Sequence, residues 1–449
     1  MVLGQPFLDN NVRTPGWDQV PDAWVEARDY LAEHQADTTT LVVPGSGFAR
    51  QDWGWTNDEP LLALGGVRWV TRSQVPLIPG QSIRFLSALD RLVTTGRATD
   101  GLSEQLARAG IGHVVVRRDL ERGRTDSPHP GVSTVSLDQP GLTPVADFGG
   151  ARDGGPRVEI YAVGASSTRV RSTAADDVVT VSGAPESVLD VQDEGLARSG
   201  RATVLAGERG WDAIPDVVTD GNQRRERAFG SVHESLSAVM EADEDYRTPR
   251  GVHDYPAVPG APQVVARYDD VLGIRASSSQ GYADTFGGVT PQNAPYAAFD
   301  GDRATRWVSS PAGKPEEQWL RIEFDGPRRL DEVTVTPVVG DAAMVPVRRF
   351  VLVAGGVERS VSVNPTGSPL VVDFRGHQAH SLEIRVDEVG STGGRGSVAI
   401  RDVTIGRATP TRSFVLPDEV GPDSGLVLES DSRGRLPGST GRAAGWHGP

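Results

Sequence analysis

The chain has 449 residues, which is too long for one ordinary hydrophobic core, so we expect roughly two to four domains. Its formal charge of −15 argues against a nucleic-acid partner, because phosphates would be repelled, and the absence of cysteine excludes disulfides, thiol catalysis and cysteine-ligated zinc. The sequence has no run of about eighteen apolar residues and no apolar leader, so we expect neither a membrane span nor a signal peptide. We interpret the start Met1-Val2-Leu3 as a fragment boundary.

Residues 1–165 predict an α/β domain in which helices pack on a sheet. Residues 21–34 place Trp24, Ala27 and Leu31 on one helical face. Apolar runs bounded by glycine and proline predict buried strands, whereas apolar residues spaced three and four apart predict helices. We expect helices over residues 21–34, 82–94 and 102–109 and strands over residues 40–44, 110–116, 132–137 and 158–162.

An aromatic and polar stretch lies within this first domain. Trp53, Trp55 and Arg72 are candidates for a sugar-binding platform, because indole faces stack on sugar rings while a guanidinium group donates to hydroxyls. The alternative is that these tryptophans pack their loop onto the sheet, since tryptophan is largely buried on average. Both interpretations stay open at this point.

A second, smaller α/β domain is predicted over residues 166–248. Its order of strand, helix and strand favours a parallel crossover. We expect strands over residues 178–183, 203–207 and 217–221 and a helix over residues 185–196. Residues 249–264 are rich in proline and predict a linker, and residues 409–449 show little periodicity, so we expect a partly disordered tail.

The stretch over residues 296–324 predicts the start of an all-β domain. Asp300 and Asp302 flank a glycine in a tight turn, and Thr305 follows three residues later. Two carboxylates and one hydroxyl then converge on one loop, an oxygen cage of the kind that Ca²⁺ prefers. Apolar and polar residues alternate over residues 318–324, as they do in a strand with one buried face.

These motifs resemble the discoidin, or coagulation-factor type C, family. Three elements stand in the order of that family, Asp-Gly-Asp-x-x-Thr-x-Trp, then Gln-Trp-Leu-x-Ile-x-Phe, then Asp331-Glu-Val-Thr-Val. The resemblance implies a jelly-roll β-sandwich over residues 265–408, a fold widely used as a carbohydrate-binding module. The expected fold class is therefore multidomain, with two small α/β domains followed by an all-β, discoidin-like sandwich.

The resemblance to the discoidin family also implies two kinds of site. Its last strand corresponds to residues 398–406, where the family commonly has a calcium-binding glutamate and this chain has an aspartate, one methylene shorter. The implied ligands of a structural Ca²⁺ are Asp300, Asp302, Thr305 and Asp402. Candidates for the variable sugar-binding loops are Tyr282, Tyr296 and Arg395.

A second resemblance spans about residues 14–408. The motifs that carry it, in order, are Pro15-Gly-Trp-Asp-Gln-Val-Pro, Leu41-Val-Val-Pro-Gly-Ser-Gly-Phe, Trp53-Gly-Trp-Thr-Asn-Asp-Glu-Pro, Arg72-Ser-Gln-Val-Pro-Leu and Leu106-Ala-Arg-Ala-Gly-Ile. They resemble the extracytoplasmic region of the actinobacterial, mycobacterial-type arabinofuranosyltransferases, large multidomain membrane enzymes of the GT-C kind. The family's catalytic carboxylate lies in its membrane domain, so no residue here matches the catalytic motif.

The resemblance implies a function in binding. The chain would be a periplasmic carbohydrate-binding and scaffolding region, joined in the parent protein to a membrane glycosyltransferase domain that adds arabinofuranose from a lipid-linked donor to cell-wall arabinan, in arabinogalactan or lipoarabinomannan. The alternative is a secreted glycoside hydrolase with a binding module, which would need two carboxylates roughly 5–10 Å apart. A passive spacer role also stays open for the middle domain.

Overall fold

The computed structural model describes residues 16–429 with several breaks. The breaks fall at residues 47, 73–79, 97–98, 100, 126, 152–153, 165–171, 197–200, 209–210, 212–213, 225–235, 245–260, 286–287, 391–393, 407–409 and 419. Most of the predicted linker thus lies outside the described residues. The chain divides into two compact units, which we describe separately. The first comprises Met1–Thr180, Ala184–Val204 and Phe229–His233, and the second comprises Val181–Gly183, Leu205–Ala228 and Glu234–Pro449.

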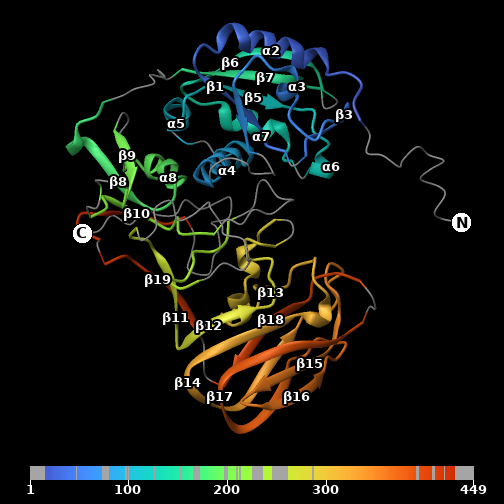
Figure 1. The fold of residues 1–449 in the computed structure, drawn as a ribbon. Coiled ribbons are helices and arrows are strands. Elements are labelled where there is room, and N and C mark those ends of the chain that lie inside the picture. Colours follow the sequence, from blue (N-terminus) through green and yellow to red (C-terminus); the bar gives the residue numbers. More distant parts are fainter. Residues whose placement is uncertain are drawn as a thin grey trace, which may run out of the picture. The chain divides into compact units, whose positions relative to one another are not determined.

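A five-stranded mixed sheet forms the centre of the first unit (Figure 1). Its strand order is β4-β1-β5-β7-β6. β1 pairs in parallel with β4 and β5, whereas β7 runs antiparallel to both β5 and β6. The strands are β1 (Thr39–Val43), β4 (Trp69–Thr71), β5 (Ile111–Arg117), β6 (Leu142–Gly150) and β7 (Pro156–Val163).

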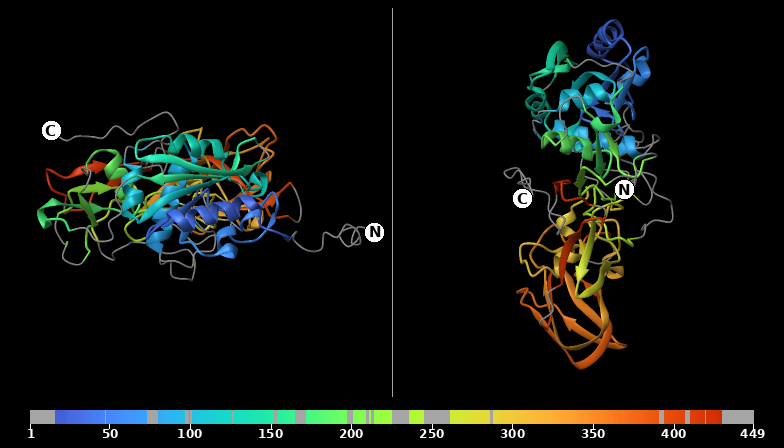
Figure 2. Two further views of the ribbon diagram at one scale, coloured as in Figure 1. Left: turned by 90° about the horizontal axis from the view of Figure 1, so that it is seen from above. Right: turned by 90° about the vertical axis from the view of Figure 1, so that its left-hand side faces the viewer.

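Helices cover both faces of this sheet, which gives a three-layer domain (Figures 1 and 2). Val42 and Val115 pack in one cluster with Trp24 of α2, whereas Leu41 packs in another with Leu89 of α4. Successive strand residues thus serve opposite faces, as the pleat requires. The helices are α2 (Asp22–His34), α3 (Pro60–Leu64), α4 (Gly80–Thr94), α5 (Leu102–Arg108), α6 (Arg122–Thr125) and α7 (Pro130–Leu137). A short hairpin consists of β2 (Arg50–Gln51) and β3 (Gly54–Trp55).

The predicted strand over residues 132–137 is wrong, because this segment is the helix α7. Pro130 occupies its first turn, where the missing N–H costs nothing. The small residues Ser133 and Ser136 face inward, and the Ser136 hydroxyl donates to the Leu92 carbonyl of α4 at 3.2 Å. The three predicted helices and the other three predicted strands of this domain are confirmed.

The smaller α/β element contains a four-stranded sheet of order β20-β10-β8-β9. β10 runs parallel to both β8 and β20. β9 lies beside β8 in this sheet, and the predicted parallel crossover between these two strands stays a prediction. β20 comes from the stretch that the sequence predicted as a tail, so the chain returns to complete this sheet after the all-β domain. The elements are η1 (Ala175–Asp177), β8 (Val178–Ser182), α8 (Ser187–Asp193), β9 (Ala202–Leu205), β10 (Val217–Thr219) and β20 (Gly425–Val427).

The all-β part of the second unit is a large antiparallel sheet that encloses one core (Figures 1 and 2). Its order is β13-β18-β14-β17-β15-β16, and β12 also pairs with β14. A separate pair joins β11 to β19. The strands are β11 (Val265–Asp269), β12 (Val271–Ala276), β13 (Trp307–Val308), β14 (Trp319–Pro337), β15 (Val347–Ala354), β16 (Val357–Ser362), β17 (Leu370–Val389), β18 (Ala399–Ile405) and β19 (Thr411–Val415). Short 3₁₀ helices are η2 (Pro291–Asn293), η3 (Pro295–Ala298) and η4 (Pro315–Glu317).

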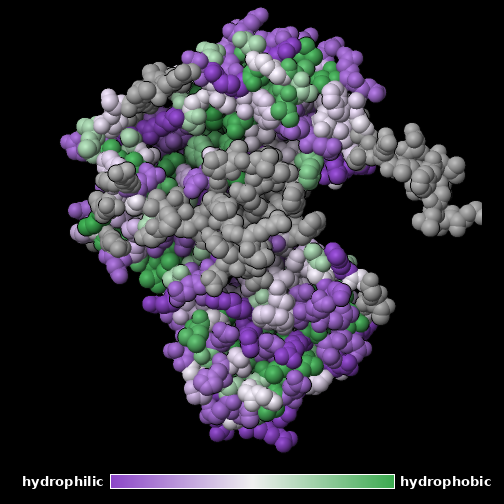
Figure 3. All heavy atoms as spheres, viewed as in Figure 1, coloured by the Kyte–Doolittle hydropathy of each residue, from purple (hydrophilic) through white to green (hydrophobic). Residues whose placement is uncertain are grey.

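The core of this sheet is aromatic and aliphatic. Trp307, Phe350 and Leu320 are fully buried in it, and hydrophilic side chains predominate on the face of this region that Figure 3 shows. The fully buried Trp307 therefore packs the sandwich core. The predicted combination of α/β layers with an all-β domain is confirmed, while the jelly-roll connectivity stays a prediction. In the part of the chain that is described, no helix is long and apolar enough to span a membrane.

Candidate functional site

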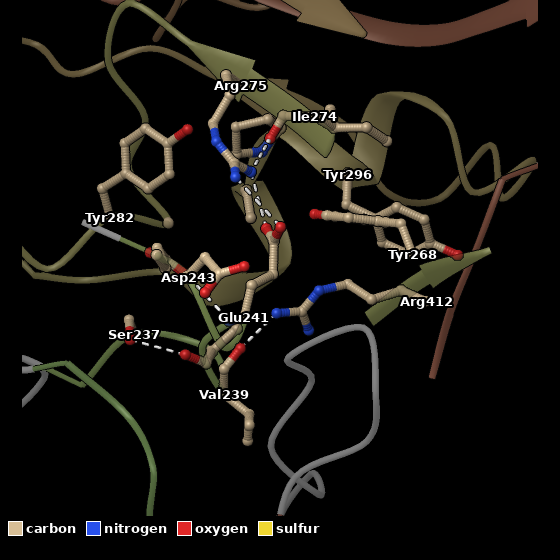
Figure 4. Close-up of a pocket in the computed structure, with 15 residues that line it drawn as sticks. Ser237, Val239, Glu241, Asp243, Tyr268, Ile274, Arg275, Tyr282, Tyr296 and Arg412 are labelled. Atoms are coloured by element: carbon tan, nitrogen blue, oxygen red, sulfur yellow. Dashed lines mark hydrogen bonds and ion pairs between the residues drawn. The ribbon is translucent and has the colours of Figure 1, made fainter. Parts of the chain in front are cut away.

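A pocket of about 360 Å³ lies in the second unit, where β11, β12 and β19 meet the segment over residues 237–244 (Figure 4). Aromatic and charged side chains share its wall. The side chains that could contact a ligand are Tyr268, Tyr282, Tyr296, Glu241, Asp243, Glu244, Arg275 and Arg412. A mixed wall of this kind suits a ligand with both apolar and hydroxyl-bearing faces.

Strand pairing explains why residues so distant in sequence meet here. Tyr268 of β11 stands opposite Arg412 of β19, and the Arg412 guanidinium lies 5.7 Å from the Tyr268 ring centroid. Glu241 forms an isolated parallel bridge with Ala266, which adds its segment to the edge of β11. The Arg412 guanidinium also donates to the Val239 carbonyl of the same segment. The pocket is therefore built from backbone ladders that flank the sandwich.

An ion pair between Glu241 and Arg275 crosses the pocket. Arg275 donates two hydrogen bonds to the Glu241 carboxylate, at 2.7 and 3.1 Å. Burial alone would lower the pKa of Arg275, but the hydrogen bonds and charge of Glu241 outweigh it and raise that pKa. Burial also raises the pKa of Glu244 and of the Tyr268 phenol. The fork geometry fixes both planar groups and leaves further lone pairs and N–H groups for a ligand.

Tyrosine rings stand on both sides of this ion pair in the view of Figure 4. The Tyr296 hydroxyl donates to the Pro410 carbonyl at 3.2 Å, and its ring centroid lies 5.6 Å from that of Tyr268. The Tyr282 hydroxyl accepts from the Ala276 amide at 3.2 Å. These bonds fix the rings, so the pocket offers preoriented aromatic surfaces beside charged hydrogen-bonding groups.

The structure brings together two of the three loop residues named from the sequence. Tyr282 and Tyr296 line the pocket, whereas Arg395 lies in an exposed loop and is not among the residues that line it. Sequence reasoning missed Arg275 and Arg412. No local pattern marks them, because their roles depend on pairing between strands on either side of the whole sandwich.

Trp53, Trp55 and Arg72 do not form a common platform. The Trp53 indole donates to the Asp119 carboxylate at 2.7 Å, so it packs its loop onto the first domain. Trp55 has the guanidinium of Arg50 4.6 Å from its ring centroid. Arg72 is buried and donates to the Ser87 hydroxyl of α4 at 2.7 Å, so it packs within the first unit.

Three of the four proposed calcium ligands form one oxygen-rich loop. The Asp300 carboxylate accepts from the Asp302 amide at 2.8 Å and from the Thr305 hydroxyl at 2.9 Å. The same hydroxyl lies 2.9 Å from the Asp302 carbonyl and 3.2 Å from the Ala297 carbonyl. One hydroxyl has one proton, so it cannot satisfy three acceptors at once. Oxygens crowded in this way fit a hard cation, which takes carbonyl and hydroxyl oxygens as well as carboxylates.

The fourth proposed ligand takes no part in this loop. Asp402 accepts a hydrogen bond from the Thr404 hydroxyl at 3.1 Å on its own strand. Across the described residues, no three aspartate, glutamate or histidine side chains gather as a metal site. A cation at Asp300 would therefore depend mainly on carbonyl and hydroxyl oxygens.

Three comparisons relate the chain to known proteins. Residues 3–253 match a family described as alpha-(1->3)-arabinofuranosyltransferase, N-terminal GT-C domain. An alpha-(1->3)-arabinofuranosyltransferase of Mycobacterium tuberculosis is 36% identical over 399 residues, which cover 82% of this chain and 28% of that protein. The enzyme of the same name from Mycolicibacterium smegmatis is 32% identical over 453 residues, 91% of this chain and 32% of the relative.

A solved structure agrees with these sequence matches. The cryo-EM structure of arabinofuranosyltransferase AftD from Mycobacteria superposes with a TM-score of 0.78 at 30% identity. That match covers 94% of this chain and 35% of the solved one. The chain thus spans about a third of the length of the relatives that it matches.

Proposed function

This chain belongs to the alpha-(1->3)-arabinofuranosyltransferase family, and from that premise we propose that it is a glycan-binding part of a membrane enzyme that builds cell-wall arabinan. In this proposal the parent protein adds arabinofuranose from a lipid-linked donor. A membrane glycosyltransferase domain of the same protein carries out the transfer at the extracytoplasmic face. The pocket in the second unit holds the acceptor arabinan.

One observation carries the proposal, namely the combination of Tyr282 and Tyr296 with the Glu241–Arg275 ion pair in one pocket. A furanose ring has C–H groups that stack on aromatic faces and hydroxyls that need donors and acceptors. The ion pair offers donors and acceptors to the sugar hydroxyls without net charge, so it suits a neutral sugar better than an anion. A pocket of about 360 Å³ admits a short terminal segment rather than a long chain.

Calorimetric titration of the chain with arabino-oligosaccharides tests the proposal, with galacto- and chito-oligosaccharides as specificity controls. We expect selective arabinan binding, and Tyr282→Ala should weaken it about tenfold, which corresponds to about 1.4 kcal/mol. The matched control is Val371→Ala, because Val371 is 59% exposed on β17 and does not line the pocket. Equal affinity of both variants for arabinan would contradict the proposed role of the pocket.

Product analysis of the same mixtures separates binding from hydrolysis. Glu241, Asp243 and Glu244 all line the pocket, and hydrolysis of a glycosidic bond would need two such carboxylates. Recovery of intact oligosaccharide is the result expected for an acceptor-holding module. Release of free arabinose, lost in Glu244→Gln, would instead identify the chain as a glycoside hydrolase.

We also propose a structural Ca²⁺ in the loop of Asp300, Asp302 and Thr305. The crowding of acceptor oxygens around the Thr305 hydroxyl supports it, since Ca²⁺ takes carboxylate, carbonyl and hydroxyl oxygens as ligands. A chelator should lower the melting temperature of the chain, and added Ca²⁺ should restore it. Asp300→Asn should remove this response. An identical melting temperature with chelator and with Ca²⁺ would rule the site out.

A further inference from the structure

A second pocket, of about 410 Å³, lies entirely within the first unit. Pro44, which directly follows β1, and Arg117, which ends β5, both line it. β1 and β5 are adjacent and parallel, so the pocket stands at the carboxyl edge of the sheet. From β1 the chain proceeds to β4 on one side, and from β5 it proceeds to β6 at the opposite edge. Adjacent strands whose connections diverge in this way leave a crevice where α/β proteins bind ligands.

The lining of this pocket combines charged groups with apolar rings. Arg118 donates to the Thr134 hydroxyl at 3.0 Å and pairs with Glu159 at 3.2 Å, and its Nε is buried without a hydrogen-bond partner among the described residues. Asp52 accepts from Arg157 at 2.6 Å. The apolar part of the wall consists of Pro44, Leu120, Pro128 and Pro130.

A buried network holds this wall rigid. The Arg117 guanidinium bonds to Glu59 and, at 2.9 Å, to Asp119. The indoles of Trp24 and Trp53 both donate to the other oxygen of Asp119, at 2.8 and 2.7 Å. The Asp119 carbonyl in turn accepts from the Asp52 amide at 2.7 Å. Asp52 is thereby fixed before any ligand arrives, which lowers the entropy cost of binding.

We propose that this crevice is a second saccharide-binding site, specific for a neutral, hydroxyl-rich sugar residue. The charges of Asp52, Arg118 and Glu121 are already balanced by Arg157, Glu159 and Arg124. Paired groups attract an anion weakly, yet they keep lone pairs and N–H groups that hydroxyls can use. Proline rings and the Leu120 side chain supply the C–H surface for the other face of the sugar. The site is independent of the pocket in the second unit and goes beyond the function proposed for it.

Gly123 offers a way to close the pocket without disturbing its floor. It lines the pocket, and a Cβ built on it meets no atom within 4 Å. Gly123→Trp should therefore fold and place a bulky indole at the wall of the crevice, while Gly123→Ala is the matched control that leaves it open. Arg122, which is exposed at the same pocket, gives a third variant, Arg122→Ala, that reports on anion binding.

The test uses the full chain carrying Tyr282→Ala, so that the pocket of the second unit is weakened first. Saturation-transfer NMR is recorded with neutral arabino-, manno- and galacto-oligosaccharides and, separately, with inorganic phosphate. We expect one of the neutral sugars to bind, at least tenfold weaker binding in Gly123→Trp, and unchanged binding in Gly123→Ala. Melting curves check that every variant folds.

Three results would overturn the inference. The first is that no neutral sugar binds in the Tyr282→Ala background. The second is that Gly123→Trp leaves sugar binding unchanged. The third is that phosphate alone binds and Arg122→Ala abolishes it, which would make the crevice an anion site. None of these results bears on the second unit, whose pocket is judged by comparing Tyr282→Ala with the unaltered chain.

Discussion

The ion pairs at the core of the first unit and those on the surface of the sandwich have the same chemistry but opposite surroundings. The side chains of Arg117 and Asp119 are 0% exposed, and that of Glu59 is 4% exposed. On the sandwich, Arg349 and its partner Asp387 are 41% and 40% exposed. Water solvates a lone charge on the surface but not one in the core, so only the buried pairs become costly when one partner is removed.

The buried cluster also shares one cation between two carboxylates. Burial would raise the pKa of Asp119, but Arg117 and the two indole donors hold that pKa below its usual range. Glu59 lacks these indole donors, and burial, the largest influence on it, raises its pKa to about 7 despite Arg117. Asp119 thus stays ionised, whereas Glu59 changes charge near neutrality.

The largest effect should come from Arg117→Met. The substitution leaves Asp119 buried without its cation, and breaking a buried pair in this way costs about 3–5 kcal/mol of unfolding free energy. Urea unfolding followed by tryptophan fluorescence measures the change, because Trp24 and Trp53 both contact the cluster. A loss below about 1 kcal/mol, the range of exposed pairs, would show that the cluster behaves like the surface ones.

A smaller, pH-dependent effect follows from Glu59. Its pKa rises from an ordinary 4.5 to about 7 in the folded chain, so the folded state binds this proton more tightly than the unfolded state. The resulting stability is complete below about pH 4.5 and is lost as the pH rises through about 7. The shift corresponds to a loss on the order of 3 kcal/mol across that interval.

Glu59→Gln isolates this contribution, because an amide keeps the size of the side chain and does not ionise. Unfolding free energies of the variant and the unaltered chain are measured at pH 5 and pH 8. We expect the unfolding free energy of the variant, relative to that of the unaltered chain, to be higher at pH 8 than at pH 5. Equal pH dependence of the two proteins would mean that Glu59 stays ionised throughout, with Arg117 compensating its burial fully.

The sequence predicted well what depends on local pattern. The helix α2 and the strands β1 and β5 follow from apolar spacing that the structure confirms. α7 was mistaken for a strand because its valines are interrupted by small serines that pack inward, and the Ser136 hydroxyl donates to the Leu92 carbonyl. Small polar residues that face inward cannot be recognised from the spacing of apolar residues, so the helical face of α7 was not visible in the sequence.

Contacts between distant segments could not be predicted in this way. β20 pairs with β10 across 208 positions, from Val217 to Gly425, so a stretch that looked like a tail completes a sheet. The same limit applies to the sites. Tyr282 and Tyr296 could be named from a family resemblance, whereas the charged partners Arg275 and Glu241 required the fold. Nor does any motif join Glu59 to Arg117.

The smallest effect is expected for Arg349→Met, the counterpart of Arg117→Met on the sandwich. Arg349 bonds to Asp387 and, at 2.7 Å, to Glu388, and these contacts raise its pKa. The guanidinium is solvated, so water takes its place beside Asp387 and Glu388 when Arg349 is replaced. The freed side chains also regain conformational entropy. We expect no resolvable change in melting temperature at 0.15 M salt. A drop comparable to that of Arg117→Met would show that the sandwich surface, like the core of the first unit, depends on a cooperative charge network.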